Sequence, residues 1–429
     1  MSLDHEQLKR RRQELAQKRK QENKKLLIRA GIAGAVLVVL ILVIFLVSKG
    51  KSDPDPTDPT LPEATGEQTT PSDQQTEASE TTPAADTVIH LAATGDLDVT
   101  DLTVAAGGEN GDFSNTFLDV AHLLGTADIS IINLEGNAVG APYGSAYRSA
   151  PKSMLDTLNA SGVDLIQLAN SYSIKNGISG LGTTIDAVRS SGMEPVGVFA
   201  NEESYDKSGG FTLCNVKGVR IAFVAFTKGM DGMTLPSGSQ NCVNVLYEDY
   251  DGQYREINTA KIDTVMSAVN KQKPDLIVAM VHWGSEFNDS ISTSQQKICQ
   301  QLQSRGADAI IGTHSHYVQQ MQFDEATGQF VAYSLGDFMG SGAWMDARFS
   351  VVLDLEITKN GENGDTRITG YSYTPIYTIY DEDVLRVVRI NETISAYESG
   401  YVGRVSEATY NAMKQALTSL EKRITKEVS

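Results

Sequence analysis

The chain has 429 residues, of which 41% are hydrophobic, enough for one large domain or two average ones. Its 54 acidic residues outnumber 36 basic ones, and the net charge of −18 argues against a nucleic-acid partner. The three cysteines, Cys214, Cys242 and Cys299, are odd in number, widely spaced and without a CxxC motif. We therefore expect buried free thiols rather than a zinc finger or a disulfide framework.

The N-terminal region predicts a membrane anchor. Residues 1–29 hold ten Lys or Arg and four Asp or Glu, a balance of 10 − 4 = +6. Residues 30–47, AGIAGAVLVVLILVIFLV, are uncharged and, with Leu26–Ile28, long enough to cross a hydrocarbon core of roughly 30 Å. The positive-inside rule then predicts a basic cytoplasmic segment over 1–25 and a single transmembrane helix over 26–48. The alternative is a cleaved signal peptide, but the end of the stretch, VSKGKSD, is no A-x-A site.

The segment over 49–86 is predicted to be a disordered linker. Pro, Thr, Ser and acidic residues dominate it, and no periodic apolar residues occur. With the N-terminus in the cytoplasm, this linker places the main part of the chain on the extracellular side of the cell membrane.

From Thr87 onward, apolar strands alternate with amphipathic helices. The expected strands are VIHLAATGD, DISIINLEG, VDLIQLAN, DLIVAMVHWG and ADAIIGTHSH. The expected helices cover 151–162, 178–192, 255–272 and 293–306. Hairpins are expected over 210–227, 320–338 and 349–377. The alternation is typical of an α/β sheet buried on both faces. We predict one α/β domain over 87–390 and a helical extension over 391–429, with a terminal helix over 406–425.

Each of the five buried strands runs into an ionisable or amide side chain. These are Asp96 with Asp98, Glu135, Asn170, His282 with Glu286, and His314 with His316. In open α/β sheets, ligands bind beyond the carboxyl ends of the strands, so parallel strands would bring these groups to one rim. Taken singly, a histidine at a strand end is more often a hydrogen-bonded surface residue, and an aspartate after glycine is often a helix cap. Five such endings in one domain favour a metal or polar-ligand site.

Carboxylates with imidazoles suit Mn, Fe or Zn, and a bridging carboxylate can hold two ions. Glu135 is the candidate bridge. On an extended segment, His314 and His316 would point to the same face and serve neighbouring ions. The chain has no GxSxG elbow, P-loop or GxGxxG after the first strand, which argues against serine-hydrolase and nucleotide-binding classes.

Six segments carry a resemblance to a known family: TGDLDVT, INLEG, LANSYSIKNG, VHWGSEF, IIGTHSHYVQ and YSLGDF. Together, over roughly 88–345, they resemble the CapA-type capsule synthesis proteins, which are linked to poly-γ-glutamate and belong to the calcineurin-like metallophosphoesterase superfamily. The resemblance implies a four-layer α/β/β/α sandwich and one or two divalent metal ions. It also implies metal roles for Asp96, Asp98, Glu135, His282, His314 and His316, with Glu135 as the bridge.

The third of these segments departs from the family pattern. The family has LANNHxxDxG where this chain has LANSYSIKNG, residues 168–177. Asn170 remains as a catalytic candidate, but Ser171 stands at the amide metal ligand, Tyr172 at the histidine general acid and Lys175 at the aspartate. A tyrosine with a pKa near 10 is a slow acid at neutral pH. Asp337 also replaces the asparagine of SLGNF, and the sequence gives it no role.

These features leave rival functions open. One is a metal-dependent hydrolase acting on an anionic polymer such as poly-γ-glutamate, with Arg148, Lys152 and Lys175 as candidate contacts to substrate. Another is a catalytically impaired relative that binds the polymer or helps to assemble or export it, together with other capsule-synthesis membrane subunits. A third is a phosphatase of envelope lipids, since the anchor would keep the domain near the membrane.

Overall fold

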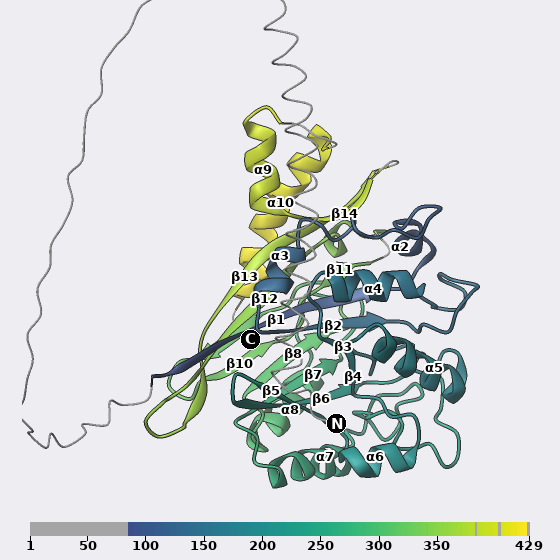
Figure 1. Ribbon diagram of the computed structural model, residues 1–429, viewed down its shortest axis with the longest axis vertical. Coiled ribbons are helices and arrows are strands. Elements are labelled where there is room, and N and C mark those ends of the chain that lie inside the picture. The colour runs from purple at the N-terminus through teal and green to yellow at the C-terminus, as the bar shows by residue number, and fades with distance from the viewer. Residues whose placement is uncertain (1–84, 341, 382–383, 402–404, 427–429) are drawn as a thin grey trace, which may run out of the picture. The chain divides into compact units, whose positions relative to one another are not determined.

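The computed structural model describes residues 85–340, 342–381, 384–401 and 405–426, which form a mixed α/β fold with two sheets (Figure 1). The predicted cytoplasmic segment over 1–25, the predicted anchor over 26–48 and the linker as far as residue 84 lie outside these residues. In the part of the chain that is described, none of the helices combines the length and the apolar character needed to span a bilayer.

The first sheet has the strand order β14-β13-β12-β1-β2-β3-β4, with β11 pairing to β1. Strands β1 to β4 run parallel, as does β11 with β1, while β12 to β14 are antiparallel to their neighbours. The bounds are β1 Thr87–Asp98, β2 Ile129–Glu135, β3 Leu165–Gln167, β4 Glu194–Val196, β11 Asp337–Met339, β12 Phe349–Lys359, β13 Thr366–Asp381 and β14 Val384–Arg389.

The second sheet has the order β5-β6-β7-β8-β10-β9. Its four inner strands are parallel, and β5 and β9 pair antiparallel at the two edges. The bounds are β5 Thr212–Val216, β6 Val219–Thr227, β7 Leu276–His282, β8 Ala309–Thr313, β9 Met321–Asp324 and β10 Gln329–Ala332.

Helices cover the outer faces of the two sheets. Phe223 and Val278 of β6 and β7 pack in the core that also holds Leu91 of β1, whereas Val224 and Ala279 pack against α7 and α8. Figure 1 shows α4 and α5 beside β2 and β3, and α7 on the side of β6. The structure is thus a mixed α/β fold in which the two sheets share one core and helices pack against both sheets. The helices are α2 Asp101–Ala105, α3 Ala121–Thr126, α4 Lys152–Ala160, α5 Gly177–Ser190, α6 Glu202–Ser208, α7 Thr259–Lys271, α8 Thr293–Ser304, α9 Ile390–Glu398 and α10 Glu407–Ile424, with a 3-10 turn at Met345–Ala347.

The predicted hairpins over 210–227 and 349–377 form as β5–β6 and β12–β13, and β9–β10 forms within 320–338. All three cysteines are buried free thiols, as predicted. The predicted extension packs on the first sheet: α9 contacts β13 and β14, and α10 contacts β12 and β13. The boundary at residue 390 stays a prediction.

Candidate metal centre

The candidate site lies where the carboxyl ends of parallel strands from both sheets meet. Asp96 stands near the end of β1, Glu135 ends β2, and both are buried. The Asp96 carboxylate accepts hydrogen bonds from Nδ2 of Asn133 at 2.5 Å and from the backbone N–H of His314 at 2.8 Å. Because His314 follows β8 of the second sheet, the latter bond joins the two sheets at the site.

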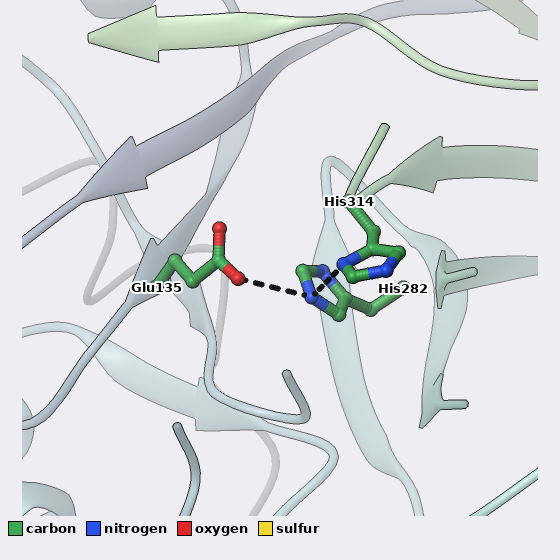
Figure 2. A group of neighbouring side chains, drawn as sticks. All are labelled: Glu135, His282 and His314. Atoms are coloured by element: carbon green, nitrogen blue, oxygen red, sulfur yellow. Dashed lines mark hydrogen bonds and ion pairs between the residues drawn. The ribbon is translucent and has the colours of Figure 1, made fainter. Parts of the chain in front are cut away.

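His282 contacts the Glu135 carboxylate, and His314 in turn contacts His282 (Figure 2). His282 ends β7, and its Nδ1 lies 2.9 Å from Oγ1 of Thr313 on the neighbouring strand, which leaves Nε2 facing the cluster. That Nε2 lies 3.2 Å from Oε1 of Glu135, 3.1 Å from Nδ1 of His314 and 3.0 Å from Oγ of Ser171. Ser171, on the loop that follows β3, therefore lies beside these donor atoms.

The segment that carries His314 and His316 is not extended, which corrects the sequence prediction. Strand β8 ends at Thr313, and the two histidines have φ angles of 87° and 58°, in the left-handed region. The two rings lie with their centroids 6.4 Å apart and their planes tilted by 46°. His316 then contacts different residues: its Nδ1 lies 2.7 Å from Oδ1 of Asp337, and its ring stacks on Phe287 at 4.9 Å.

The described residues offer two candidate metal groups that share Glu135. In each, one donor atom per residue lies within 4.8 Å of the others. The other carboxylate oxygen, Oε2 of Glu135, is buried and has no hydrogen-bond partner among the described residues. A buried unpaired carboxylate oxygen is costly unless a cation binds it, so the arrangement fits a metal. The groups are Glu135, His282 and His314, and Asp96, Glu135 and His316.

The donor spacing of the first group also fits a small divalent ion. Bonds of about 2.0–2.1 Å in a tetrahedral shell put neighbouring donor atoms about 3.3–3.4 Å apart. The distances from Nε2 of His282 to Glu135, His314 and Ser171 are 3.2, 3.1 and 3.0 Å, and Oγ of Ser171 lies 3.5 Å from Nδ1 of His314. The mixed nitrogen and oxygen donors suit Zn, Mn or Fe.

The protonation of the three histidines follows from their surroundings. Burial lowers the pKa of His282 and, together with His282, that of His314, so both are neutral and available as ligands. Burial acts in the same direction on His316, but Asp337, followed by Glu135 and Asp96, outweighs it and raises the His316 pKa well above its usual value.

Asp98 lies outside both metal groups and pairs with Arg148 instead. Nη1 of Arg148 donates to Oδ1 of Asp98 at 2.5 Å, while its Nη2 donates to the hydroxyl of Tyr172 at 2.8 Å. Burial and Glu135 raise the pKa of Asp98 to about 7, although Arg148 opposes the shift. Burial also raises the pKa of Tyr172 above its usual value in spite of the adjacent guanidinium. Tyr172 thus holds its proton tightly.

Asn170, the other catalytic candidate, holds the loop together. Its Nδ2 donates to the side chain of Asn133 and to the backbone oxygen of Leu134 at 2.7 Å, and its Oδ1 accepts from the N–H of Tyr172. These bonds use both the amide nitrogen and the amide oxygen of the Asn170 side chain. The same loop delivers Ser171 to the metal group and Tyr172 to Arg148.

The two remaining predicted contacts to substrate lie apart from the metal groups. Lys152 begins α4 and pairs with Asp156 of the same helix at 2.5 Å. Nζ of Lys175 lies 4.0 Å from Oδ2 of Asp231. Of the predicted contacts Arg148, Lys152 and Lys175, only Arg148 lines one of the two cavities at the metal groups.

Two cavities open onto the site. The first, of about 510 Å³, is bordered by Asp98, Glu135, Arg148 and His316 among others. The second, of about 260 Å³, reaches Ser171 and His314. Tyr172 and Glu286 line both.

Sequence reasoning missed the contributions of Asp337 and Lys228. Asp337 was visible as a departure from SLGNF, but its contact with His316 depends on β11 pairing with β1. Lys228 follows β6, whose apolar run IAFVAF is followed by Thr227. The rule that polar residues follow buried strands applies to Lys228 as well, and it would have drawn attention to this residue.

The bacterial capsule synthesis protein family, PGA_cap, matches residues 90–341. The chain belongs to this family. In this PGA_cap protein the match covers the strands and loops that build both metal groups, up to the segment after β11. The resemblance to CapA-type proteins is thereby confirmed.

Two curated relatives of this PGA_cap protein are capsule proteins. It is 27% identical over 215 residues to the capsule biosynthesis protein CapA of Bacillus anthracis, covering 50% of this chain and 49% of that protein. It is 25% identical over 227 residues to the PGA biosynthesis protein CapA of Bacillus subtilis strain 168, covering 51% and 56%. The matched part of the chain thus spans about half the length of these relatives.

Solved structures resemble this PGA_cap protein weakly. A hypothetical protein from Thermus thermophilus has a TM-score of 0.40 at 14% identity, covering 67% of this chain and 98% of that one. A phosphatase from Mycoplasma pneumoniae has a TM-score of 0.41 at 12% identity, covering 68% and 94%. Structural similarity at this level is not evidence about the substrate or the reaction.

Proposed function

We propose that this chain is a metal-dependent hydrolase of capsule polymer synthesis, with a metallophosphoesterase-like fold, acting on an anionic polymer such as poly-γ-glutamate outside the cell. The observation that carries the proposal is the pair of buried donor groups that share Glu135, one of whose oxygens has no other partner among the described residues. The anchor expected over 26–48 would hold the domain at the membrane, where the polymer emerges. The polymer class is supported by the Bacillus subtilis relative, a PGA biosynthesis protein, and by the Bacillus anthracis relative, a capsule biosynthesis protein.

The chain's own residues define what the site can do. Divalent ions at the two groups would supply positive charge that polarises the bond to be cut. Asp96 is fixed by Asn133 and the His314 backbone, so its carboxylate is held in place before an ion binds. In the first cavity, the guanidinium of Arg148 faces an incoming carboxylate or phosphate and orients it beside Tyr172.

Metal content tests this proposal directly. The full chain, purified and loaded with Mn, Fe or Zn, is expected to hold about two ions by mass spectrometry. His314→Ala removes a ligand from one group and should lose about one of them. His122→Ala, a histidine on α3 away from the site, is the matched control and should change nothing. A wild-type chain that takes up no metal under these conditions would refute the hydrolase proposal.

A polymer-binding protein without catalytic activity is the second candidate, and the Asp98–Arg148–Tyr172 contacts favour it. They place a phenol that holds its proton tightly where the family pattern has a histidine general acid, and they pair Asp98, a predicted metal ligand, with a cation.

Restoring the family residues separates the two candidates. Wild-type chain and the double variant Ser171→Asn with Tyr172→His would be compared for release of short products from poly-γ-glutamate. A general acid contributes about 10²–10⁴-fold in rate. An inactive wild type with an active double variant would identify a binding protein, whereas measurable wild-type turnover would identify an enzyme.

A further inference from the structure

The second cavity contains a cation that neither the metal groups nor the first cavity uses. Lys228 follows β6, and its backbone N–H donates to the carbonyl of His282 at 2.8 Å, which fixes it beside the end of β7. Its Nζ donates to the backbone oxygen of Gly284 at 2.7 Å and lies 4.5 Å from the centre of the Tyr254 ring. The side chain is half-buried. The ammonium is therefore held in place by its surroundings.

This ammonium has unused capacity to bind an anion. It carries three donors, and the contacts within the described residues give it one acceptor and a ring face, with no Asp or Glu oxygen at ion-pair distance. Burial lowers the pKa of Lys228, an effect that Glu286 opposes. Holding a half-buried ammonium without a close carboxylate costs free energy, which an anion bound in the cavity would recover.

The other groups around the cavity are compatible with a small oxyanion. Ser171 and His314 connect it to the metal group, and Ser285 adds a second hydroxyl. Two carboxylates also line it. Asp231 lies 4.0 Å from Lys175 and is largely exposed, and Glu286 is exposed at the border with the first cavity. Both acids are thus solvated, whereas the cation is the half-buried charge.

We propose that the second cavity is a binding site for one oxyanion, a carboxylate or a phosphate, and that Lys228 selects for its negative charge. The inference rests on the proposed function only in taking the polymer as the source of that oxyanion. Because Tyr172 and Glu286 line both cavities, an extended polyanion has a cation in each: Arg148 in the first and Lys228 in the second. A polymer with a carboxylate on every unit matches this arrangement.

The chain offers a matched control for Lys228. Lys261 on α7 is also a half-buried lysine over a tyrosine ring, 4.2 Å from the centre of Tyr205, and its Nζ donates to Oδ1 of Asn241 at 2.6 Å. It lines neither cavity. The substitution Lys261→Gln therefore repeats the loss of a lysine over an aromatic ring without touching the site.

The test is isothermal titration of the full, metal-loaded chain with inorganic phosphate and, separately, with a γ-linked glutamate trimer. A hydrogen bond to a charged group contributes about 1.5–3 kcal/mol, so Lys228→Gln is expected to weaken binding of at least one probe by about tenfold or more. Lys228→Arg should keep most of the affinity, and Lys261→Gln should match wild type. Melting temperature and metal content, measured on every variant, show that fold and metal are intact.

The outcomes separate this inference from the proposed function. Trimer binding that depends on Lys228 supports both. Phosphate binding that depends on Lys228, with no binding of the trimer, supports the oxyanion site and removes the polymer as its source. If every probe that binds the wild-type chain binds Lys228→Gln equally well, the inference is overturned and the proposed function still stands. A wild-type chain that binds neither probe also overturns it.

Discussion

At the residue scale, Asp337 controls how His316 meets the metal group. Its Oδ1 lies 2.7 Å from Nδ1 of His316, and the same ring nitrogen lies 4.0 Å from Oδ2 of Asp96. Asp337 reaches this position because β11 pairs in parallel with β1, with Asp337 opposite Asp96. A carboxylate behind a ligating histidine fixes its ring and raises its basicity as a ligand.

Replacing Asp337 with alanine is therefore expected to weaken metal binding by about 10–100-fold, measured by titration of the metal-free chain. Asp337→Asn, which restores the family residue and keeps an acceptor, should lose less. The control is Asp354→Ala, which removes the partner of the exposed His90, at 3.1 Å, in an Asp–His pair away from the site. Equal metal affinity in Asp337→Ala and wild type would show that Asp337 does not position His316.

A second residue-scale feature is the close approach of β1 to the segment before β11. Gly95 precedes Asp96, whose N–H donates to the carbonyl of Gly336 at 3.0 Å. A Cβ atom at Gly95 would lie 1.7 Å from that oxygen, a backbone atom that cannot rotate away.

We expect Gly95→Ala to destabilise the fold by about 3 kcal/mol or more, because the strands must separate. The measurement is the free energy of unfolding in urea. Gly370→Ala on β13, where an added Cβ meets nothing within 4 Å, is the control. A Gly95→Ala chain as stable as the control would contradict the packing described.

At the element scale, one local device starts four parallel strand pairs. An aspartate just before a strand accepts the backbone N–H of a residue in the neighbouring strand, while its own N–H donates to that same residue's carbonyl. The two bonds set the register at the point where pairing begins, and with it the positions of the polar residues at the other end. The pairs are Asp128 with His90, Asp164 with Ser130, Asp275 with Arg220 and Asp308 with Ile277.

This device predicts a pH dependence at Asp308. Burial raises its pKa to about 6, although the bond from Ile277 opposes the shift. A carboxyl group whose folded pKa is raised binds protons more tightly in the folded state, so stability falls as pH rises from about 4 to about 6. Asp308→Asn keeps the acceptor without the charge and should be more stable than wild type by about 1–2 kcal/mol at pH 7.

The check is the free energy of unfolding of wild type and Asp308→Asn at pH 4 and pH 7. The difference between the two chains should be small at the lower pH and should favour the variant at the higher. Asp365→Asn, in the exposed turn between β12 and β13, provides a comparison. A variant that is less stable than wild type at pH 7 would mean that the ionised carboxylate strengthens the strand start.

At the scale of the whole molecule, the C-terminal helix holds the segments beside the site. Helix α10 lies beyond the family match and packs on β12 and β13. Its Arg423 donates to Asp346 at 2.8 Å, lies 3.7 Å from Asp289 and covers the ring of Tyr317 at 4.9 Å. These partners come from the 3-10 turn, the loop after β7 and the residue next to His316.

Arg423→Met removes the cation that lies between Asp346 and Asp289, so it should lower the free energy of unfolding by about 1–2 kcal/mol. The loss stays modest because both carboxylates remain solvated. The substitution should also change the fluorescence of Trp344, which is 54% exposed and precedes the turn that carries Asp346, relative to that of the buried Trp283. Lys422→Met, the exposed neighbour on α10, is the control. Identical melting temperatures and quenching in both variants would rule out this coupling.

The sequence alone determined the five buried strands and the polar residue that follows each one. These depend on local patterns, since a short apolar run rich in β-branched residues and bounded by turn residues is typical of a buried strand. The same patterns placed Asp96, Glu135, His282, His314 and His316 at strand ends, and the structure brings all five into the two metal groups.

Only the tertiary structure decided which side chains meet. The contact of Asp96 with His314 joins residues 218 apart, and that of Asp98 with Arg148 joins residues 50 apart. Such pairs depend on strand register, on how the two sheets face each other, and on the left-handed turn at His314 and His316, none of which a local pattern records. The same long-range geometry leaves Asp98 outside the metal groups and brings Asp337 into contact with His316. It also places Lys228 in the second cavity, where no described carboxylate lies at ion-pair distance.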